Sequence, residues 1–293
     1  MELRVLRYFL AVAREENISR AADVLYVTQP TLSRQLMELE DELGTKLFIR
    51  GKRKITLTDE GLLLRRRAEE ILDLVRKTQT EFDSQEEIVS GNIFIGGGET
   101  ESMSIIARIA REMQRDYPYV RFNIYSGDSK DVTERLDKGL LDFGLLIELN
   151  PLKYESLRLP AVDTWGLLMR KDSPLAARKT IKPKDLWNIP LITSRQSLAA
   201  EKILKWLNKD FDELNLVATY NLVYNASLMV REGMGYALCL DRLVNTSGPG
   251  TLCFRPLWPV LESNLHMVWK KDQVFSKASG LFLKKLRQAL VQE

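Results

Sequence analysis

The first ninety residues carry hydrophobic side chains at the three- and four-residue spacing of amphipathic helices. A first helix is predicted over residues 2–15, and Ser19 is expected to be the N-cap of a short second helix. Thr28 should cap a third helix, which tolerates Pro30 in its first turn and ends at Gly44. The pattern therefore predicts three short helices at the start of the chain.

The third predicted helix divides its residues between two faces. One face is an apolar stripe that should pack on the first two helices: Leu32, Leu36, Leu39 and Leu43. The other face begins with short or planar polar side chains: Gln29, Thr31, Ser33, Arg34 and Gln35. Such side chains suit the edges of DNA bases, because Arg can address guanine and Gln adenine through two hydrogen bonds. The alternative is an ordinary polar face exposed to solvent.

Two short strands with a basic tip are predicted next, over residues 46–50 and 54–57, with Gly51 between them. The segment from the first strand to the second has no acidic residue and five cations: Lys46, Arg50, Lys52, Arg53 and Lys54. A basic run alone is usually a solvated face. When a basic hairpin follows a helix that can read bases, however, it can lie along the DNA phosphates. The three helices and the hairpin together therefore predict a winged helix-turn-helix.

A long helix should begin at Thr58, where Asp59 and Glu60 suit the positive end of the helix dipole. Apolar or small residues then alternate spacings of four and three: Leu57, Gly61, Leu64, Ala68, Ile71, Val75, Thr78 and Phe82. We expect this seam to bury Leu64, Ala68, Ile71, Val75 and Phe82 against a second copy of the chain. The alternative is a helix packed on its own chain. A two-fold dimer would present two recognition helices to a pseudo-palindromic DNA operator.

From residue 91 onward the pattern changes to alternating strands and helices, which predicts two α/β lobes with mostly parallel strands. Strands are expected at 93–95, 120–125, 141–147, 165–169, 191–193, 216–220, 236–240 and 265–269. Helices are expected at 103–117, 131–138, 199–208, 227–231 and 275–290.

These patterns together predict the organisation of the chain. A winged helix-turn-helix domain should cover residues 1–58 and a linker and dimerisation helix residues 59–90. An α/β effector-binding domain should cover residues 91–293, with a first lobe of about 91–162 and 267–293 and a second of about 163–266.

Two joined α/β lobes leave a cleft at the carboxyl ends of their strands, where ligands usually bind. The residues expected there follow the predicted strands: Thr100, Glu101, Ser102, Asp128, Glu148, Thr193 and Ser194. Each hydroxyl has the alternative role of a simple helix cap. Helix starts and Arg195 favour an anionic ligand, whereas Glu99 and Glu101 oppose one, so the charge of the ligand stays open.

Composition narrows the class of protein. With 293 residues, 45% of them hydrophobic, and a net charge of +3, the chain suits two or three packed domains. No apolar run approaches the roughly 20 residues that span a bilayer, and the start of the chain lacks the features of a signal peptide. A cytoplasmic location is therefore expected. The cysteines, Cys239 and Cys253, should be buried thiols, and no metal or cofactor is expected beyond a small-molecule effector.

An enzyme is the rival class. Nucleophilic chemistry with a histidine would have to use His266, which falls in a predicted strand and is expected to be structural. A glycine-rich nucleotide loop starting at Gly96 would need a third glycine where the chain has Glu101. These residues favour a protein without catalytic residues.

The sequence resembles the LysR-type transcriptional regulators over its whole length. The closest agreement lies in Ser19 to Leu25, Thr28 to Gln35, Leu39-Glu40, Leu43-Gly44, Leu47 to Arg50 and Leu57 to Gly61. Weaker agreement continues through Tyr117-Pro118, Gly139 to Asp142, Ser173 to Ala176 and Gly233 to Gly235. The chain departs from the family at Leu240-Asp241, where many members have proline, and in Gly96-Gly97-Gly98, which we interpret as an unusually flexible run.

This resemblance implies a sequence-specific regulator of transcription that responds to a small-molecule effector. It implies an effector domain like a periplasmic binding protein, antiparallel pairing of the long helices, a tetramer of two dimers, and RNA polymerase as a partner. The residues implied to contact DNA are Gln29, Pro30, Thr31, Ser33, Arg34, Arg50 and Arg53; those at the effector are Thr100, Ser102, Thr193 and Ser194. The alternative is a regulator of the same architecture that works without an effector.

Overall fold

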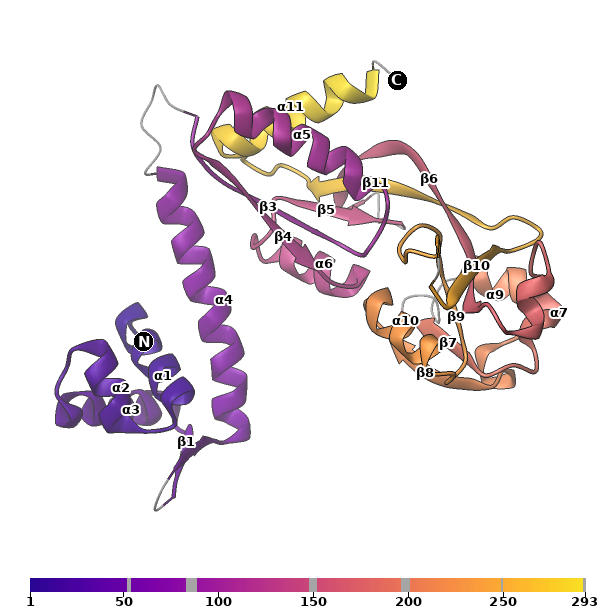
Figure 1. The fold of residues 1–293 in the computed structure, drawn as a ribbon. Coiled ribbons are helices and arrows are strands. Elements are labelled where there is room, and N and C mark those ends of the chain that lie inside the picture. Colours follow the sequence, from indigo (N-terminus) through magenta and orange to yellow (C-terminus); the bar gives the residue numbers. More distant parts are fainter. Residues whose placement is uncertain (52–53, 83–88, 148–151, 196–200, 249, 292–293) are drawn as a thin grey trace. The chain divides into compact units, whose positions relative to one another are not determined.

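The chain divides into two units, Met1–Asp83 and Ser84–Glu293. The computed structural model describes residues 1–51, 54–82, 89–147, 152–195, 201–248 and 250–291, and Figure 1 shows how the elements are arranged within each unit. Within these ranges, no helix combines the length and the apolar character needed to cross a membrane.

Helices and one hairpin build the first unit. The elements are α1 (Leu3–Glu15), α2 (Ile18–Leu25), α3 (Gln29–Leu43), β1 (Phe48–Arg50), β2 (Ile55–Leu57) and α4 (Asp59–Phe82). Strands β1 and β2 pair antiparallel and form the predicted wing. The helices enclose a core in which Phe9, Leu32 and Leu36 are almost completely buried. The winged helix-turn-helix predicted from the sequence is therefore confirmed.

Two details of this unit differ from the prediction. Asn17, and not Ser19, caps α2, because Asn17 has an extended backbone and its side chain accepts a hydrogen bond from the Arg20 amide, whereas Ser19 already lies inside the helix. Leu43 was expected in the buried stripe but is 41% exposed. It is the last residue of α3 and lies outside the core cluster.

A single mixed sheet organises the second unit. Its strands, within the described residues, are β3 (Gly91–Gly97), β4 (Val120–Ser126), β5 (Phe143–Leu146), β6 (Tyr154–Arg170), β7 (Leu191–Ser194), β8 (Leu216–Tyr220), β9 (Tyr236–Leu240), β10 (Leu252–Pro256) and β11 (Glu262–Lys270). They follow the order β4-β3-β5-β11-β6-β9-β7-β8, with β10 paired to β6. The parallel strands β3, β4 and β5 form one lobe and β7, β8 and β9 the other. The long antiparallel strands β6 and β11 join the two lobes.

Helices cover both faces of each lobe (Figure 1). They are α5 (Met103–Asp116), α6 (Ser129–Asp137), α7 (Pro183–Leu186), α9 (Glu201–Leu207), α10 (Val223–Arg231) and α11 (Lys277–Val291), with short turns η1 (Pro174–Ala177) and η2 (Phe211–Glu213). In the first lobe, α5 and α11 share one core cluster and α6 belongs to another. In the second, α7 and α9 share one cluster and α10 lies in the other.

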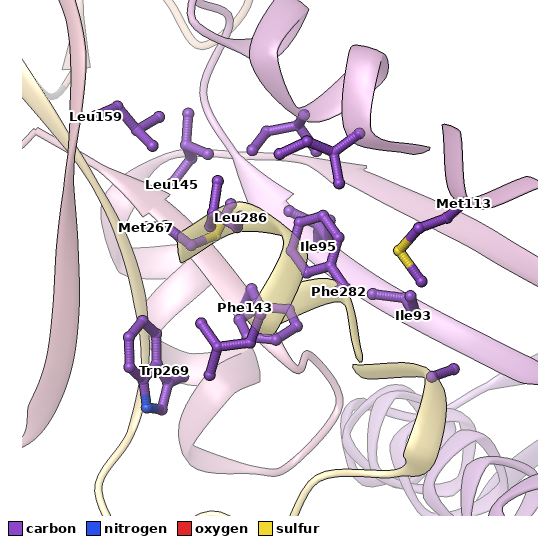
Figure 2. Close-up of a cluster of buried hydrophobic side chains, with 14 of the residues drawn as sticks. Ile93, Ile95, Met113, Phe143, Leu145, Leu159, Met267, Trp269, Phe282 and Leu286 are labelled. Carbon is purple, nitrogen blue, oxygen red and sulfur yellow. The ribbon is translucent and has the colours of Figure 1, made fainter. Parts of the chain in front are cut away.

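The core of the first lobe is centred on Phe143, which is fully buried between the sheet and α11 (Figure 2). Its ring lies 5.1 Å from the ring centroids of both Phe275 and Phe282. In the second lobe Cys239 and Cys253 are buried free thiols, as predicted, and burial raises the pKa of Cys239 to about 12. Both lobes are thus packed tightly enough to hold the strand ends in place.

The prediction missed strand β10 and the first half of β6. Charged residues and Pro160 interrupt the apolar pattern of residues 154–162, because this half of β6 exposes many of its side chains. The expectation that Gly96-Gly97-Gly98 is flexible is also wrong for its first two residues. Gly96 and Gly97 are buried in β3, and a Cβ on Gly97 would lie 2.8 Å from the Cβ of Leu145. These glycines permit close packing rather than motion.

Candidate functional site

The N-terminal half of α3 presents the side chains expected to read DNA. Gln29, Pro30, Thr31 and Arg34 are exposed and Ser33 is half-buried, while the opposite leucine stripe anchors the helix in the core. The hydroxyls of Thr28 and Thr31 are hydrogen-bonded at 2.8 Å. The structure therefore brings the five predicted residues of this helix to one end of it.

Glu38 accepts hydrogen bonds from two of the side chains that the sequence predicts to read bases. Its carboxylate accepts hydrogen bonds from Arg34 Nε at 3.0 Å and from Gln35 Nε2 at 2.6 Å. The Arg34 side chain remains 75% exposed, so its guanidinium keeps donors available to a base edge. Sequence reasoning overlooked Glu38, although its spacing of four from Arg34 is the spacing of helical ion pairs.

The base of the wing is fixed from both sides. Buried Glu40 of α3 accepts hydrogen bonds from the amides of Leu47 and Phe48 at 2.8 and 3.3 Å and from Lys46 Nζ at 3.0 Å. Thr58 Oγ1, at the start of α4, donates to the Lys46 carbonyl at 2.7 Å. These bonds place β1, and with it the backbone of Arg50, beside the recognition helix.

The basic tip of the wing falls partly outside the described residues. Arg53 and Lys52 lie there, as does the side chain of Arg50, whose backbone ends β1. Lys54, just before the second strand, pairs with Glu16 at 2.7 Å, and the amide of Ile55, the first residue of that strand, donates to the Glu16 carbonyl at 2.9 Å. The wing is therefore also tied to the end of α1.

Helix α4 packs on its own unit over half of the predicted seam. Ala68 is fully buried and Leu64 and Ile71 are partly buried in the core shared with α1. A side chain without exposed surface cannot contact a second copy, so Ala68 is not a dimer contact in this structure. Val75 is half-buried, and the side chain of Phe82 lies outside the described residues. The exposed apolar residues of α4 are instead Leu62, Leu63 and Leu74.

The second unit contains a cleft between its lobes. Its apolar lining includes Leu145, Ile147, Trp165, Val223, Leu240, Leu243 and Leu265. The other lining residues are Gly98, Glu99, Thr100, Ser129, Ser194, Tyr220 and Asn221. The strand ends of both lobes thus meet at one concave site, where an apolar body and a few polar groups of a ligand would find partners.

The predicted effector residues have different positions relative to this cleft. Thr100 and Ser194 line it. Ser102 and Thr193 are buried, and within the described part of the chain neither hydroxyl oxygen has a hydrogen-bond partner. Buried hydroxyls of this kind are costly unless another group satisfies them.

Of the remaining predicted effector residues, neither Glu101 nor Asp128 lines the cleft. Glu101 is exposed, and Asp128 is the N-cap of α6, where it accepts from the Asp131 amide at 2.9 Å. Asp128 thus has the cap role that the sequence left as the alternative for hydroxyl residues. Glu148 lies outside the described residues.

Two consecutive residues connect the first lobe to the rest of the cleft. Thr100 Oγ1 donates to Asp163 Oδ2 at 2.5 Å, on the strand that crosses between the lobes. The pKa of the Asp163 carboxyl is raised, mainly because the group is buried and also because Glu101 is nearby. The hydrogen bond from Thr100 and the charge of Arg242 lower this pKa, but by less. Glu99 Oε2 accepts the amide of Val223, the first residue of α10. The sequence predicted that Glu99 opposes an anionic ligand, but it did not predict the contact with α10.

The other cleft residues that sequence reasoning missed come mostly from the second lobe. Tyr220 and Asn221 lie at the end of β8, and the Tyr220 hydroxyl donates to the Leu238 carbonyl at 2.8 Å. Burial, with Cys239 and Glu99 nearby, raises the pKa of Tyr220 well above its usual value. The signal that could have found them is the one applied to the first lobe: they directly follow a predicted strand.

No metal-binding chemistry is apparent. The described residues contain no cluster of three or more His, Cys, Asp and Glu side chains that could hold a metal ion. His266 lies in β11, where burial and the nearby Arg158 lower its pKa. Within the described residues its Nδ1 is buried without a hydrogen-bond partner.

Comparison with known proteins identifies both units. Residues 3–62 match the bacterial regulatory helix-turn-helix proteins of the lysR family, and residues 87–291 match the LysR substrate-binding domain. The HTH-type transcriptional regulator BsdA of Bacillus subtilis (strain 168) is 33% identical over 221 residues, which cover 74% of each chain. A probable RuBisCO transcriptional regulator of Synechocystis sp. is 27% identical over 97% of this chain and 84% of its own.

Solved structures show the same fold over the full length. CbnR in complex with its target DNA has a TM-score of 0.74 and 20% sequence identity, and the alignment covers 99% of this chain and 100% of CbnR. Full-length BenM has a TM-score of 0.56 and 24% sequence identity, and the alignment covers 100% of this chain and 96% of the BenM chain. The predicted architecture, a winged helix-turn-helix followed by a two-lobed α/β domain, is confirmed. The chain belongs to the LysR family and is a transcriptional regulator with a DNA-binding and an effector-binding domain, not an enzyme.

Proposed function

We propose that α3 and the wing divide the work of DNA binding in this regulator. Gln29, Pro30, Thr31 and Arg34, which are exposed, and the half-buried Ser33 would enter the major groove and select the sequence, and Arg50 and Arg53 would contact phosphates. The observation that carries this proposal is the pinning of the wing to the recognition helix through Glu40. It gives the base contacts and the phosphate contacts one fixed geometry.

Binding to operator and random DNA at several salt concentrations tests this division. Arg34→Ala should cost about 1–3 kcal/mol on the operator and relax the preference at one half-site position. Arg53→Ala should weaken binding to all sequences alike and reduce the log–log salt slope by about 0.9. Equal losses on both kinds of DNA for Arg34→Ala would show that Arg34 contacts phosphate instead.

We further propose that two copies of the chain dimerise through α4. The contact would use residues other than Leu64, Ala68 and Ile71, which pack in the core of their own unit. Leu63 and Leu74 are eleven positions apart, about three helical turns, so they lie on the same face, and both are exposed. Burying them against a second α4 would remove a surface that is otherwise unfavourable in water. A pseudo-palindromic operator and a tetramer of two dimers are further parts of this proposal, with RNA polymerase as the partner that reads the outcome.

Sedimentation of the full chain tests the dimer contact. Leu74→Arg should raise the dimer dissociation constant at least tenfold, because an arginine on the contact face must be desolvated. Leu152→Arg is the control, since Leu152 is 84% exposed and lies in the second unit. A dimer unchanged by Leu74→Arg would place the contact elsewhere.

We propose that the interlobe cleft binds the effector, with Thr100 and Ser194 in its lining. Ser102 and Thr193 are close to these residues in the chain, and within the described residues their buried hydroxyls have no hydrogen-bond partner. The rival is a regulator that needs no effector. Screening metabolites by melting temperature and by DNA footprint separates the two. A ligand whose effect is abolished by Thr100→Val supports the cleft, whereas a broad set without any effect supports the rival. Genome-wide mapping of bound sites would nominate the first compounds to test.

A further inference from the structure

An acidic side chain of the first lobe caps a helix of the second lobe. Glu99 lies in the loop between β3 and α5, and its Oε2 accepts the amide of Val223, 124 positions away in the chain. Val223 is the first residue of the nine-residue helix α10, whose N-cap, Leu222, offers no side-chain hydrogen bond. The free amides and the dipole at such a helix start favour a negative charge. Glu99 therefore supplies from another lobe the acceptor that the local sequence lacks.

The next residue extends this connection to the strand between the lobes. Thr100 donates to Asp163 of β6 at 2.5 Å, and both side chains are buried. Glu99, Thr100 and Val223 all line the cleft. The loop after β3 thus touches the second lobe and the crossing strand at the same site where a ligand would lie.

The charges around this contact decide which ligands it admits. Besides Glu99, the buried Asp163 and the exposed Glu101 lie on the same loop and strand, and Arg242 is the cation that acts on Asp163. A ligand carboxylate at the start of α10 would have to displace Glu99 or lie beside it, and like charges at contact distance repel strongly at a partly buried site. Within the described residues only Oε2 of Glu99 is hydrogen-bonded to protein, which leaves Oε1 as an acceptor.

We propose that Glu99 determines the charge class of the effector, because its carboxylate fills the anion position at the start of α10. The cleft therefore takes a small apolar molecule whose head group donates hydrogen bonds and is neutral or cationic, and it rejects carboxylates. This inference rests on the proposal that the cleft is the effector site. It also assigns Glu99 a positioning role, because the same carboxylate holds the two lobes together.

An NMR titration tests the proposal without knowledge of the effector. Small ions are added to the full chain, and the chemical shift of the Val223 backbone amide is followed. In the wild type, acetate should leave this signal unchanged relative to sodium chloride of equal ionic strength. In Glu99→Ala, acetate should shift it in a saturable way and bind at least about tenfold more tightly than in the wild type. Methylammonium should shift the signal in the wild type and lose this effect in Glu99→Ala.

Two further variants guard the interpretation. Glu101→Ala removes an exposed carboxylate two residues away that does not line the cleft, so it should tighten acetate binding much less than Glu99→Ala does. Glu99→Gln keeps an acceptor for the Val223 amide while removing the charge, so it remains informative if Glu99→Ala does not fold, and it should bind acetate more tightly than the wild type.

The proposal is overturned if acetate binds the wild type as tightly as Glu99→Ala and Glu99→Gln, or if it binds neither variant. Failure of the effector proposal would have another signature. In that case acetate would still discriminate between the wild type and the variants, but no metabolite would change DNA binding.

Discussion

Replacing Glu40 with alanine should open the base of the wing. The Glu40 side chain is 3% exposed, and it accepts hydrogen bonds from the backbone amides of Leu47 and Phe48. Both of these residues are also buried. Alanine leaves both N–H groups without an acceptor, and each unsatisfied buried donor costs about 1–3 kcal/mol. Because the bond to Phe48 is long, at 3.3 Å, we expect a total loss of about 2–4 kcal/mol.

Two matched variants separate the amide bonds from the ion pair. Lys46 Nζ lies 3.0 Å from Glu40, but its side chain is 70% exposed, and such exposed charges contribute about 0–1 kcal/mol. Lys46→Ala should therefore change little. Glu40→Gln, which keeps one acceptor oxygen, should fall between Lys46→Ala and Glu40→Ala.

Amide hydrogen exchange in the full chain, together with DNA affinity at fixed salt, measures these effects. In Glu40→Ala the amides of Leu47 and Phe48 should exchange at least tenfold faster, and affinity should fall on all sequences because the wing no longer has a fixed position. If Glu40→Ala exchanges no faster than Lys46→Ala, the carboxylate does not hold the wing and the reasoning is wrong.

The same carboxylate gives the wing a pH dependence. Burial raises the pKa of Glu40, but the Leu47 amide, Lys46 and the Phe48 amide lower it more, and the result lies below the usual 4.5. A carboxyl group with a lowered pKa stabilises the fold fully above its unfolded value and loses this contribution as pH falls through its folded value. Protection of the wing amides should therefore decline below about pH 4.5 in the wild type, and this decline should be weaker in Glu40→Gln.

Three other substitutions test the recognition helix, the crossing strand β6 and the core of the first lobe. Glu38→Gln should raise affinity for random DNA, because it removes a negative charge beside Arg34, and reduce the ratio of specific to random binding; an unchanged ratio would show that Glu38 does not orient Arg34. Asp163→Asn should raise the melting temperature at pH 7, since burial raises the pKa of Asp163 and its ionised form is the unfavourable one. This advantage should shrink on acidification, and a lower melting temperature at pH 7 would contradict it. Phe143→Ala should lower the unfolding free energy of the second unit by about 3–5 kcal/mol in calorimetry, and a loss under about 1 kcal/mol would mean that the aromatic cluster collapses around the cavity.

The sequence predicted the first unit closely because its signals are local. Thr28 and Gly44 bound the recognition helix in the structure as they do in the sequence pattern. The seam on α4 shows where such signals become ambiguous. Spacings of three and four arise equally from a helix that faces a partner and from one that packs on its own chain, and only the position of α1 reveals that Ala68 is already buried.

The cleft was predictable only in part. Residues that follow predicted strands gave Thr100 and Ser194, because strand ends can be read from local pattern. The contact from Glu99 to Val223 could not be predicted in this way, since it depends on how β6 and β11 bring two lobes together. The sequence analysis interpreted Glu99 as a charge that opposes an anionic ligand, whereas in the structure its carboxylate accepts a hydrogen bond from the first residue of α10.

The contacts at the start of α4 limit how a signal can reach DNA. The Thr58 hydroxyl donates to the Lys46 carbonyl and accepts the Gly61 amide at 2.9 Å, so it joins the wing to the first turn of α4. At Gly61 any Cβ would collide with the Leu47 carbonyl, which shows how closely the helix and the wing approach. A rotation of α4 relative to the wing would break these bonds, at a net cost of about 0.5–1.5 kcal/mol for each. A small rigid displacement of the whole first unit breaks none of them. We therefore expect an effector to change the distance and angle between the two recognition helices of a dimer, and so the bend of the DNA, rather than the shape of one DNA-binding domain.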